Sequence, residues 1–177
     1  MLLSLNNLDS KTRQFMLDEI EMDIANNDLY ISSRLSSTGQ NDYVSLLKQA
    51  VELHDDAWLA QQLRLSGRIN ATEQRKTPKG GTTTARIPVT APETLAEGEF
   101  NRFYVHGLCR RAIDEGISDL IIYRAKQVTN PRPDSEGKIG TRINTQALLN
   151  DLRTHRDVDP ALGLPAGPNS GLSVKLP

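Results

Sequence analysis

Apolar residues recur at three- and four-residue spacing in several stretches of the chain, which is the pattern of a helix with one buried face. In the first stretch Met16, Ile20 and Ile24 share a face, and Asp9 precedes them as a candidate cap. Later stretches repeat this spacing. The sequence therefore predicts helices over residues 10–28, 42–53, 56–66, 92–115 and 144–154.

Turn and capping residues indicate where these helices begin. Residues 38–41 (TGQN) are typical of a turn ahead of the second helix. Asp55 and Asn144 can cap the third and the last helix, and Thr90 with Pro92 marks the start of the longest. We expect this longest helix to form the centre of the core.

Two glycines, Gly98 and Gly107, lie inside the longest predicted helix. Each costs about 1 kcal/mol of helix stability relative to alanine. The sequence therefore predicts a kink or a close helix contact at these positions.

Three segments lack helical spacing. Residues 119–128 are rich in β-branched side chains and predict a strand, and the prolines after it predict a polar loop over 130–143. Residues 68–91 are polar, with Gly80-Gly81 in the middle, and predict a protruding β-hairpin arm or a functional loop. Residues 157–177 are rich in proline and glycine, and predict an extended arm that lies in a groove on a neighbour or adds to a sheet edge.

The predicted fold is mainly helical α+β, with a small helical core, one short strand region, a β-like arm and an extended C-terminal arm. Its segments are an acidic helical region (1–67), a basic β-like arm or loop (68–91), a helix–strand–helix core (92–156) and the C-terminal arm (157–177). The apolar residues of this last arm that we expect to dock on a partner are Leu162, Leu164, Leu172, Val174 and Leu176.

Composition excludes several classes of protein. The chain has 177 residues, of which 37% are hydrophobic, and a net charge of −1. No stretch approaches the ~20 apolar residues of a transmembrane helix, so we expect no membrane contact. The one cysteine, Cys109, excludes an intramolecular disulfide and a Cys-rich zinc site.

Charge is distributed unevenly along the chain. Residues 1–60 hold four basic and ten acidic residues, whereas residues 61–142 hold fourteen basic and nine acidic residues. Either the fold brings these regions together, or the protein has two oppositely charged faces.

No motif for catalysis or cofactor binding stands out. His106 and Cys109 lie three residues apart on the longest helix, but two ligands do not make a zinc site. The glycine-rich middle of the arm lacks the GxxxxGK[ST] phosphate loop, and no GxSxG occurs. The helix dipole accounts for Glu93, Glu97 and Glu99 near the start of the longest helix. We therefore expect a non-enzymatic protein without a cofactor or metal.

Basic loops make phosphate contact a candidate function. These loops have no aromatic residues for base stacking, so they predict non-specific contact with DNA rather than reading of a base sequence. The candidate phosphate-facing residues are Arg68, Arg75, Lys76, Lys79, Arg86, Arg132, Lys138 and Arg142.

The block TAPETLAEGEFNRFYVHGLCRRAIDEG, the following YRAKQV and PRPDSE, and the closing LGLPAGPNSGLSVKLP resemble proteins from tailed-phage and prophage gene clusters. The resemblance covers residues 85–177 and brings no catalytic residues with it. It implies a virion structural protein, and among such proteins it favours a head–tail connector. Such adaptors are often small, mainly helical, ring-forming proteins, and many have an extended terminus that docks onto the portal or the next protomer.

The resemblance also implies partners and a location. The partners would be further copies of the chain in a ring and the portal, capsid or tail components of a virion assembled in the bacterial host cytoplasm. A capsid decoration protein or a minor capsid protein is the alternative within this class. A small DNA-associated accessory protein is the alternative from another class, and a strong salt dependence of its DNA affinity would favour it.

Overall fold

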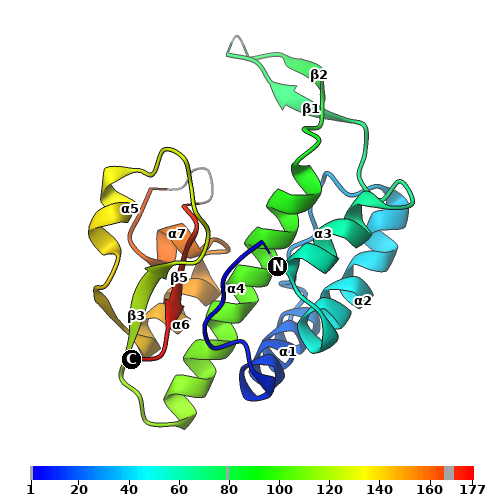
Figure 1. The fold of residues 1–177 in the computed structure, drawn as a ribbon. Helices are drawn as coiled ribbons and strands as arrows, with labels where there is room; N and C mark the ends of the chain where they lie inside the picture. Colours follow the sequence, from blue (N-terminus) through cyan, green and yellow to red (C-terminus); the bar gives the residue numbers. More distant parts are fainter. Residues whose placement is uncertain (1, 79, 166–169) are drawn as a thin grey trace.

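The computed structural model describes residues 2–78, 80–165 and 170–177. It confirms the mainly helical α+β fold (Figure 1). The helices of the described residues are α1 (Ser10–Ala25), α2 (Ser37–Leu53), α3 (Asp56–Arg64), α4 (Ala91–Asp114), α5 (Pro133–Lys138), α6 (Thr145–Thr154) and α7 (Val158–Ala161). The strands are β1 (Thr72–Lys76), β2 (Thr82–Arg86), β3 (Asp119–Arg124), β4 (Arg142–Asn144) and β5 (Leu172–Lys175).

Helix α4 lies at the centre of the molecule. Figure 1 shows it between α1, α2 and α3 on one side and β3, β5 and α6 on the other. Phe100, Phe103, Tyr104 and Leu108 on this helix are fully buried. Burial of a large apolar side chain stabilises a fold by about 1.5–3 kcal/mol relative to exposure. The apolar residues of α4 therefore organise the core, as the sequence predicts.

Helix α1 meets α4 at Gly107, where there is no room for a side chain. A Cβ at this position would lie 2.7 Å from Cγ of Met16 and 2.8 Å from the Met16 backbone nitrogen. The predicted close contact is therefore confirmed at Gly107. Gly98 differs, because a Cβ there would meet nothing within 4 Å.

Three of the five helices that the sequence predicts are capped by the side chains identified there. The side chains of Asp9, Asp55 and Asn144 accept hydrogen bonds from backbone N–H groups in the first turns of α1, α3 and α6. Thr90 precedes α4 but makes no side-chain capping bond. Its helix is held by packing along its length rather than by this cap.

The predicted turn at residues 38–41 is wrong, because α2 already begins at Ser37 and is capped by Ser36. Gly39 is inside the helix, and a Cβ there would lie 2.1 Å from the carbonyl oxygen of Arg68. The glycine is required by the chain that passes beside it, and not by a turn.

The three-stranded sheet has the order β4–β3–β5, with both pairings antiparallel. Strand β3 confirms the predicted strand, although it ends at Arg124. The stretch 130–143, predicted as a polar loop, contains α5 and the start of β4. Both elements are too short to produce a periodic pattern in the sequence.

Of the two alternatives predicted for the C-terminal segment, addition to a sheet edge is confirmed, but the segment is not an arm that projects from the body, because residues 158–165 and 170–176 pack into the chain's own fold. Strand β5 pairs with β3, with Val174 opposite Ile122. The apolar spacing indicated burial correctly, but the partner is the edge of the chain's own sheet. Of the predicted docking residues, Leu162, Leu164, Leu172 and Val174 are at most 5% exposed, and Leu176 packs against the core. The intervening residues 166–169 lie outside the described part of the chain.

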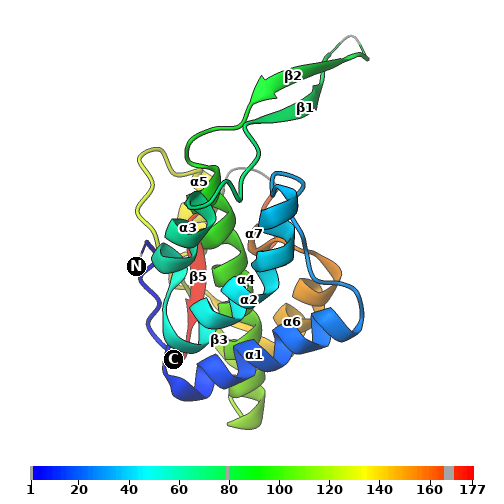
Figure 2. The same cartoon turned by 90° about the vertical axis from the view of Figure 1, so that its right-hand side faces the viewer.

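Strands β1 and β2 form an antiparallel hairpin where the sequence predicts a β-like arm, with Thr72 opposite Arg86 and Lys76 opposite Thr82. Figures 1 and 2 show this hairpin projecting away from the helical body. Most of its side chains are exposed.

Gly98→Ala and Gly107→Ala form a matched pair on one helix. We expect Gly98→Ala to stabilise the protein by up to about 1 kcal/mol, because alanine favours the helix and the new methyl group meets open space. Gly107→Ala should lower the unfolding free energy, because its methyl group collides with Met16. Urea unfolding of both variants measures the two effects. Changes of the same sign would contradict this packing of α4.

Candidate functional site

The predicted phosphate-facing residues do not form one surface, and two of them hold the fold together. Nε of Arg68 donates a hydrogen bond to Oδ2 of Asp42 at 2.8 Å. Nη2 of Arg132 donates to Oδ2 of Asp159 at 2.6 Å. Both arginines join segments far apart in the sequence, and this structural role accounts for their charge.

The hairpin holds two exposed cations that have no ion-pair partner among the described residues, Lys76 and Arg86. The strand register places both on one face of the hairpin. They lie about 13 Å apart along the strands, given the rise per residue. Arg75 lies on the other face and pairs with Glu73 at 2.6 Å. The predicted Lys79 lies outside the described residues.

Lys138 and Arg142 likewise have no ion-pair partner among the described residues. Lys138 ends α5, which Figure 1 shows in the part of the body that holds β3 and α7, and Arg142 begins β4. The free cations of the predicted set are therefore split between the hairpin and the body of the molecule.

The acidic N-terminal region and the basic middle of the chain meet inside the fold. Nη1 of Arg102 lies 3.1 Å from Oδ2 of Asp23 on α1, and Nη2 lies 3.2 Å from Oε2 of Glu99. The side chains of all three are at most 12% exposed. Of the two outcomes that the charge pattern left open, the structure shows intramolecular pairing for these groups.

Glu19 is the most heavily paired carboxylate of this network. It is fully buried, and Arg110 and Arg153 donate to its Oε1 at 2.7 and 3.0 Å, while Nδ1 of His106 lies 3.0 Å from Oε2. Burial alone would raise the pKa of Glu19, but hydrogen bonds from His106, Arg153 and Arg110 outweigh burial and lower the pKa to about 2.

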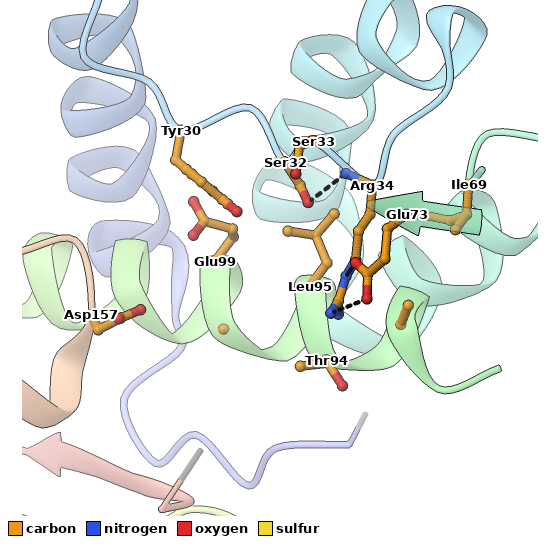
Figure 3. Close-up of a pocket in the computed structure, with 12 residues that line it drawn as sticks. Tyr30, Ser32, Ser33, Arg34, Ile69, Glu73, Thr94, Leu95, Glu99 and Asp157 are labelled. Atoms are coloured by element: carbon orange, nitrogen blue, oxygen red, sulfur yellow. Dashed lines mark hydrogen bonds and ion pairs between the residues drawn. The ribbon is translucent and has the colours of Figure 1, made fainter. Parts of the chain in front are cut away.

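A pocket of about 390 Å³ lies where the hairpin joins the body. We call it the hairpin-base pocket. Its lining comes from α4, from the loop after α1, from Glu73 on β1, and from Asp157 ahead of α7. Figure 3 shows Tyr30 and Glu99 pointing toward one another at one end and the Arg34–Glu73 pair at the other. Nε of Arg34 donates to Oε2 of Glu73 at 2.6 Å.

Glu99 is the unusual group of this pocket. It is 7% exposed and contributes to the lining together with Asp157. Burial, against the opposing effect of Arg102 and with a smaller contribution from the carboxylates of Asp157 and Asp23, raises the pKa of Glu99 to about 7. The pocket therefore has a carboxyl group that titrates near neutral pH.

Gly98 helps to create the pocket space. It contributes to the lining, and a Cβ there would meet no neighbouring atom within 4 Å. The loss of helix stability that this glycine causes thus coincides with an open cavity. The sequence predicts a kink or a close helix contact, and no close contact occurs here.

The sequence interpretation of the acids on α4 as helix-dipole residues is wrong for Glu97 and Glu99. Glu97 accepts from Nζ of Lys126 at 2.5 and 2.6 Å, and Glu99 accepts from Arg102. The helix dipole acts on charges within the first turn, and both residues lie beyond that turn. Tyr30 and Asp157, which complete the pocket, carried no signal because they lie far from α4 in the sequence.

No protein-family model, curated protein or solved structure matches the chain. Among the described residues, no three His, Cys, Asp or Glu side chains are arranged to hold a metal ion. In the same part of the chain, no helix has the length and apolar character needed to cross a membrane. The function must therefore be inferred from the hairpin and the pockets.

Glu99 predicts a specific pH dependence of stability. Between its ordinary pKa of 4.5 and about 7 the unfolded chain loses the proton while folded Glu99 keeps it, so the wild type loses stability as pH rises through this interval. Glu99→Gln removes this effect. We expect the melting temperature of the variant, relative to wild type, to rise between about pH 5 and about pH 8. The exposed Glu52→Gln is the control, and a difference that stays flat with pH for Glu99→Gln would contradict the assignment.

Proposed function

We propose that this protein is a structural assembly protein of a tailed-phage particle, a head–tail connector subunit that contacts its neighbours through the β1–β2 hairpin. The observation that carries the proposal is the hairpin itself. It projects from the body, and its exposed strands add little to the core (Figure 1). A lone two-stranded hairpin is at best marginally stable in water, so contact with a partner would complete it.

Two features of the hairpin support a partner contact. Its sheet has two strands, so each strand has an outer edge that pairs with no other described strand and is open to strand addition. Lys76 and Arg86 on one face add positive charge that the chain's described residues leave unpaired. The C-terminal segment cannot serve as the docking arm, because its apolar residues are buried in the chain's own core.

The hairpin-base pocket supplies the complementary surface of a second copy. Glu99 and Asp157 line it, and Asp157 is exposed at its edge. A protomer's own hairpin contributes Glu73 to the lining, while its strands project away from the helical body (Figures 1 and 2). A basic projection and an acidic recess on one protomer are two unlike faces, which is what head-to-tail contacts in a closed ring require.

Light scattering measures the proposed association directly. We expect wild type to form an oligomer that a short Gly/Ser replacement of residues 72–86 reduces to a monomer, with unchanged helix content by circular dichroism. Lys76→Glu should weaken the oligomer through charge repulsion, and adding Asp157→Lys should restore it. Arg142→Glu, an exposed cation outside the hairpin, is the matched control.

An oligomer that survives removal of the hairpin would overturn docking through it. A monomer in every variant, together with DNA binding that weakens steeply with salt and depends on Lys76 and Arg86, would instead favour the DNA-associated accessory protein.

A further inference from the structure

A second pocket, of about 310 Å³, lies on the other side of the Arg102 ion pairs from the hairpin-base pocket. We call it the histidine pocket. The C-terminal end of α1, the C-terminal end of α6 and the middle of α4 enclose it. Its charged and histidine lining residues are Asp23 at the end of α1 and Asp28 just after it, Arg102 and His106 from α4, and Arg153 at the end of α6 with Arg156 just after it.

His106 brings a buried nitrogen without a partner to this pocket. The side chain is 1% exposed, and Nδ1 lies 3.0 Å from Oε2 of Glu19. Because an ionised carboxylate only accepts hydrogen bonds, Nδ1 is the donor in that contact. Nε2 is buried and makes no hydrogen bond with any described residue. Buried polar atoms are nearly always satisfied in folded proteins, and His106 belongs to the lining of this pocket, so a ligand there could supply the missing partner.

Two arginines leave positive charge available beside His106. Arg156 is exposed and has no ion-pair partner among the described residues. Nη2 of Arg153 donates a hydrogen bond to Glu19, and the guanidinium has further N–H groups that can donate to a ligand. Arg102 also contributes to the lining, but Glu99 and Asp23 already accept from it.

Negative groups near the pocket oppose an anion. Asp28 is exposed at its edge, and the ends of α1 and α6 carry the partial negative charge of helix C-termini. Hydrogen bonds between a guanidinium and a phosphate oxygen are charge-assisted and stronger than a helix-end effect that solvent screens. The lining carboxylate of Asp23 is already paired with Arg102, so among the described lining residues Arg153 and Arg156 face the single unpaired carboxylate of Asp28, and the balance favours an anion that both arginines contact.

We infer that the histidine pocket binds a phosphoryl group. Its oxygens accept hydrogen bonds from Arg153 and Arg156, with the fork geometry that suits phosphate. A protonated phosphate oxygen donates to Nε2 of neutral His106, or Nε2–H of the imidazolium donates to a phosphate oxygen. The group comes either from free phosphate or a phosphomonoester, or from the phosphodiester backbone of a nucleic acid.

Isothermal titration calorimetry of the full-length protein with inorganic phosphate tests this site. We expect Arg156→Ala to weaken binding about fivefold or more, because it removes a charge-assisted contact. Asp28→Asn should tighten binding about twofold or more, because it removes a repelling charge. Both residues are exposed, so neither change threatens the fold, and Arg142→Ala is the control for an exposed arginine elsewhere.

His106→Asn isolates the unpartnered nitrogen, because the asparagine amide can replace Nδ1 against Glu19 but leaves nothing at the position of Nε2. We expect this variant to lose phosphate binding. If the His106→Asn variant unfolds, the opposite effects of the Arg156 and Asp28 variants on phosphate affinity still test the site. No measurable heat with phosphate, or affinities equal in wild type, Arg156→Ala and Asp28→Asn, would overturn the site.

A thymidine dinucleotide without terminal phosphates distinguishes the two sources. Competition by this phosphodiester, abolished by Arg156→Ala, would assign the pocket to a nucleic-acid backbone. Binding of inorganic phosphate without such competition would assign it to free phosphate or a phosphomonoester.

Discussion

Helices α1 and α4 can approach as closely as they do only because position 107 has no side chain. This contact brings the polar residues of α1 against α4 together with the apolar ones. Glu19 then reaches His106 and Arg110, and one turn further along α1 Asp23 reaches Arg102. Without that approach these carboxylates would lie too far from their cations, and the charged groups would be buried unpaired, which is strongly destabilising.

The two central carboxylates have opposite pKa shifts for a clear physical reason. Burial penalises the ionised form of both. Glu19 receives hydrogen bonds from three side chains, whereas Glu99, within the described part of the chain, receives them from Arg102 and lies near two other carboxylates. The protein thus keeps one permanent charge between α1, α4 and α6, and one carboxyl group near its titration point at the hairpin-base pocket. Each group lies next to a pocket, and the two pockets are separated by Arg102.

Local chemistry made much of the fold predictable from the sequence. Asp9, Asp55 and Asn144 cap helices because capping depends on residues three or four positions apart. Long-range contacts defeated the same kind of reasoning. Gly39 looks like a turn residue, but it is required by the backbone of Arg68. Leu172 and Val174 indicate a buried strand, but nothing in their spacing says whether the partner is another chain or β3. The pockets were not predicted, because Tyr30, Glu99 and Asp157 meet only after folding.

Strand β5 has a consequence for the order in which the protein can be made. Residues 172–175 complete the sheet against β3, which is synthesised some fifty residues earlier. Until the ribosome has produced β5, the apolar edge of β3 at Ile122 lacks its partner strand, and an open strand edge is a template for pairing with other chains. A nascent chain in which β5 has not yet paired therefore has an open sheet edge at β3, and the later pairing of β5 closes the edge along which aggregation would begin.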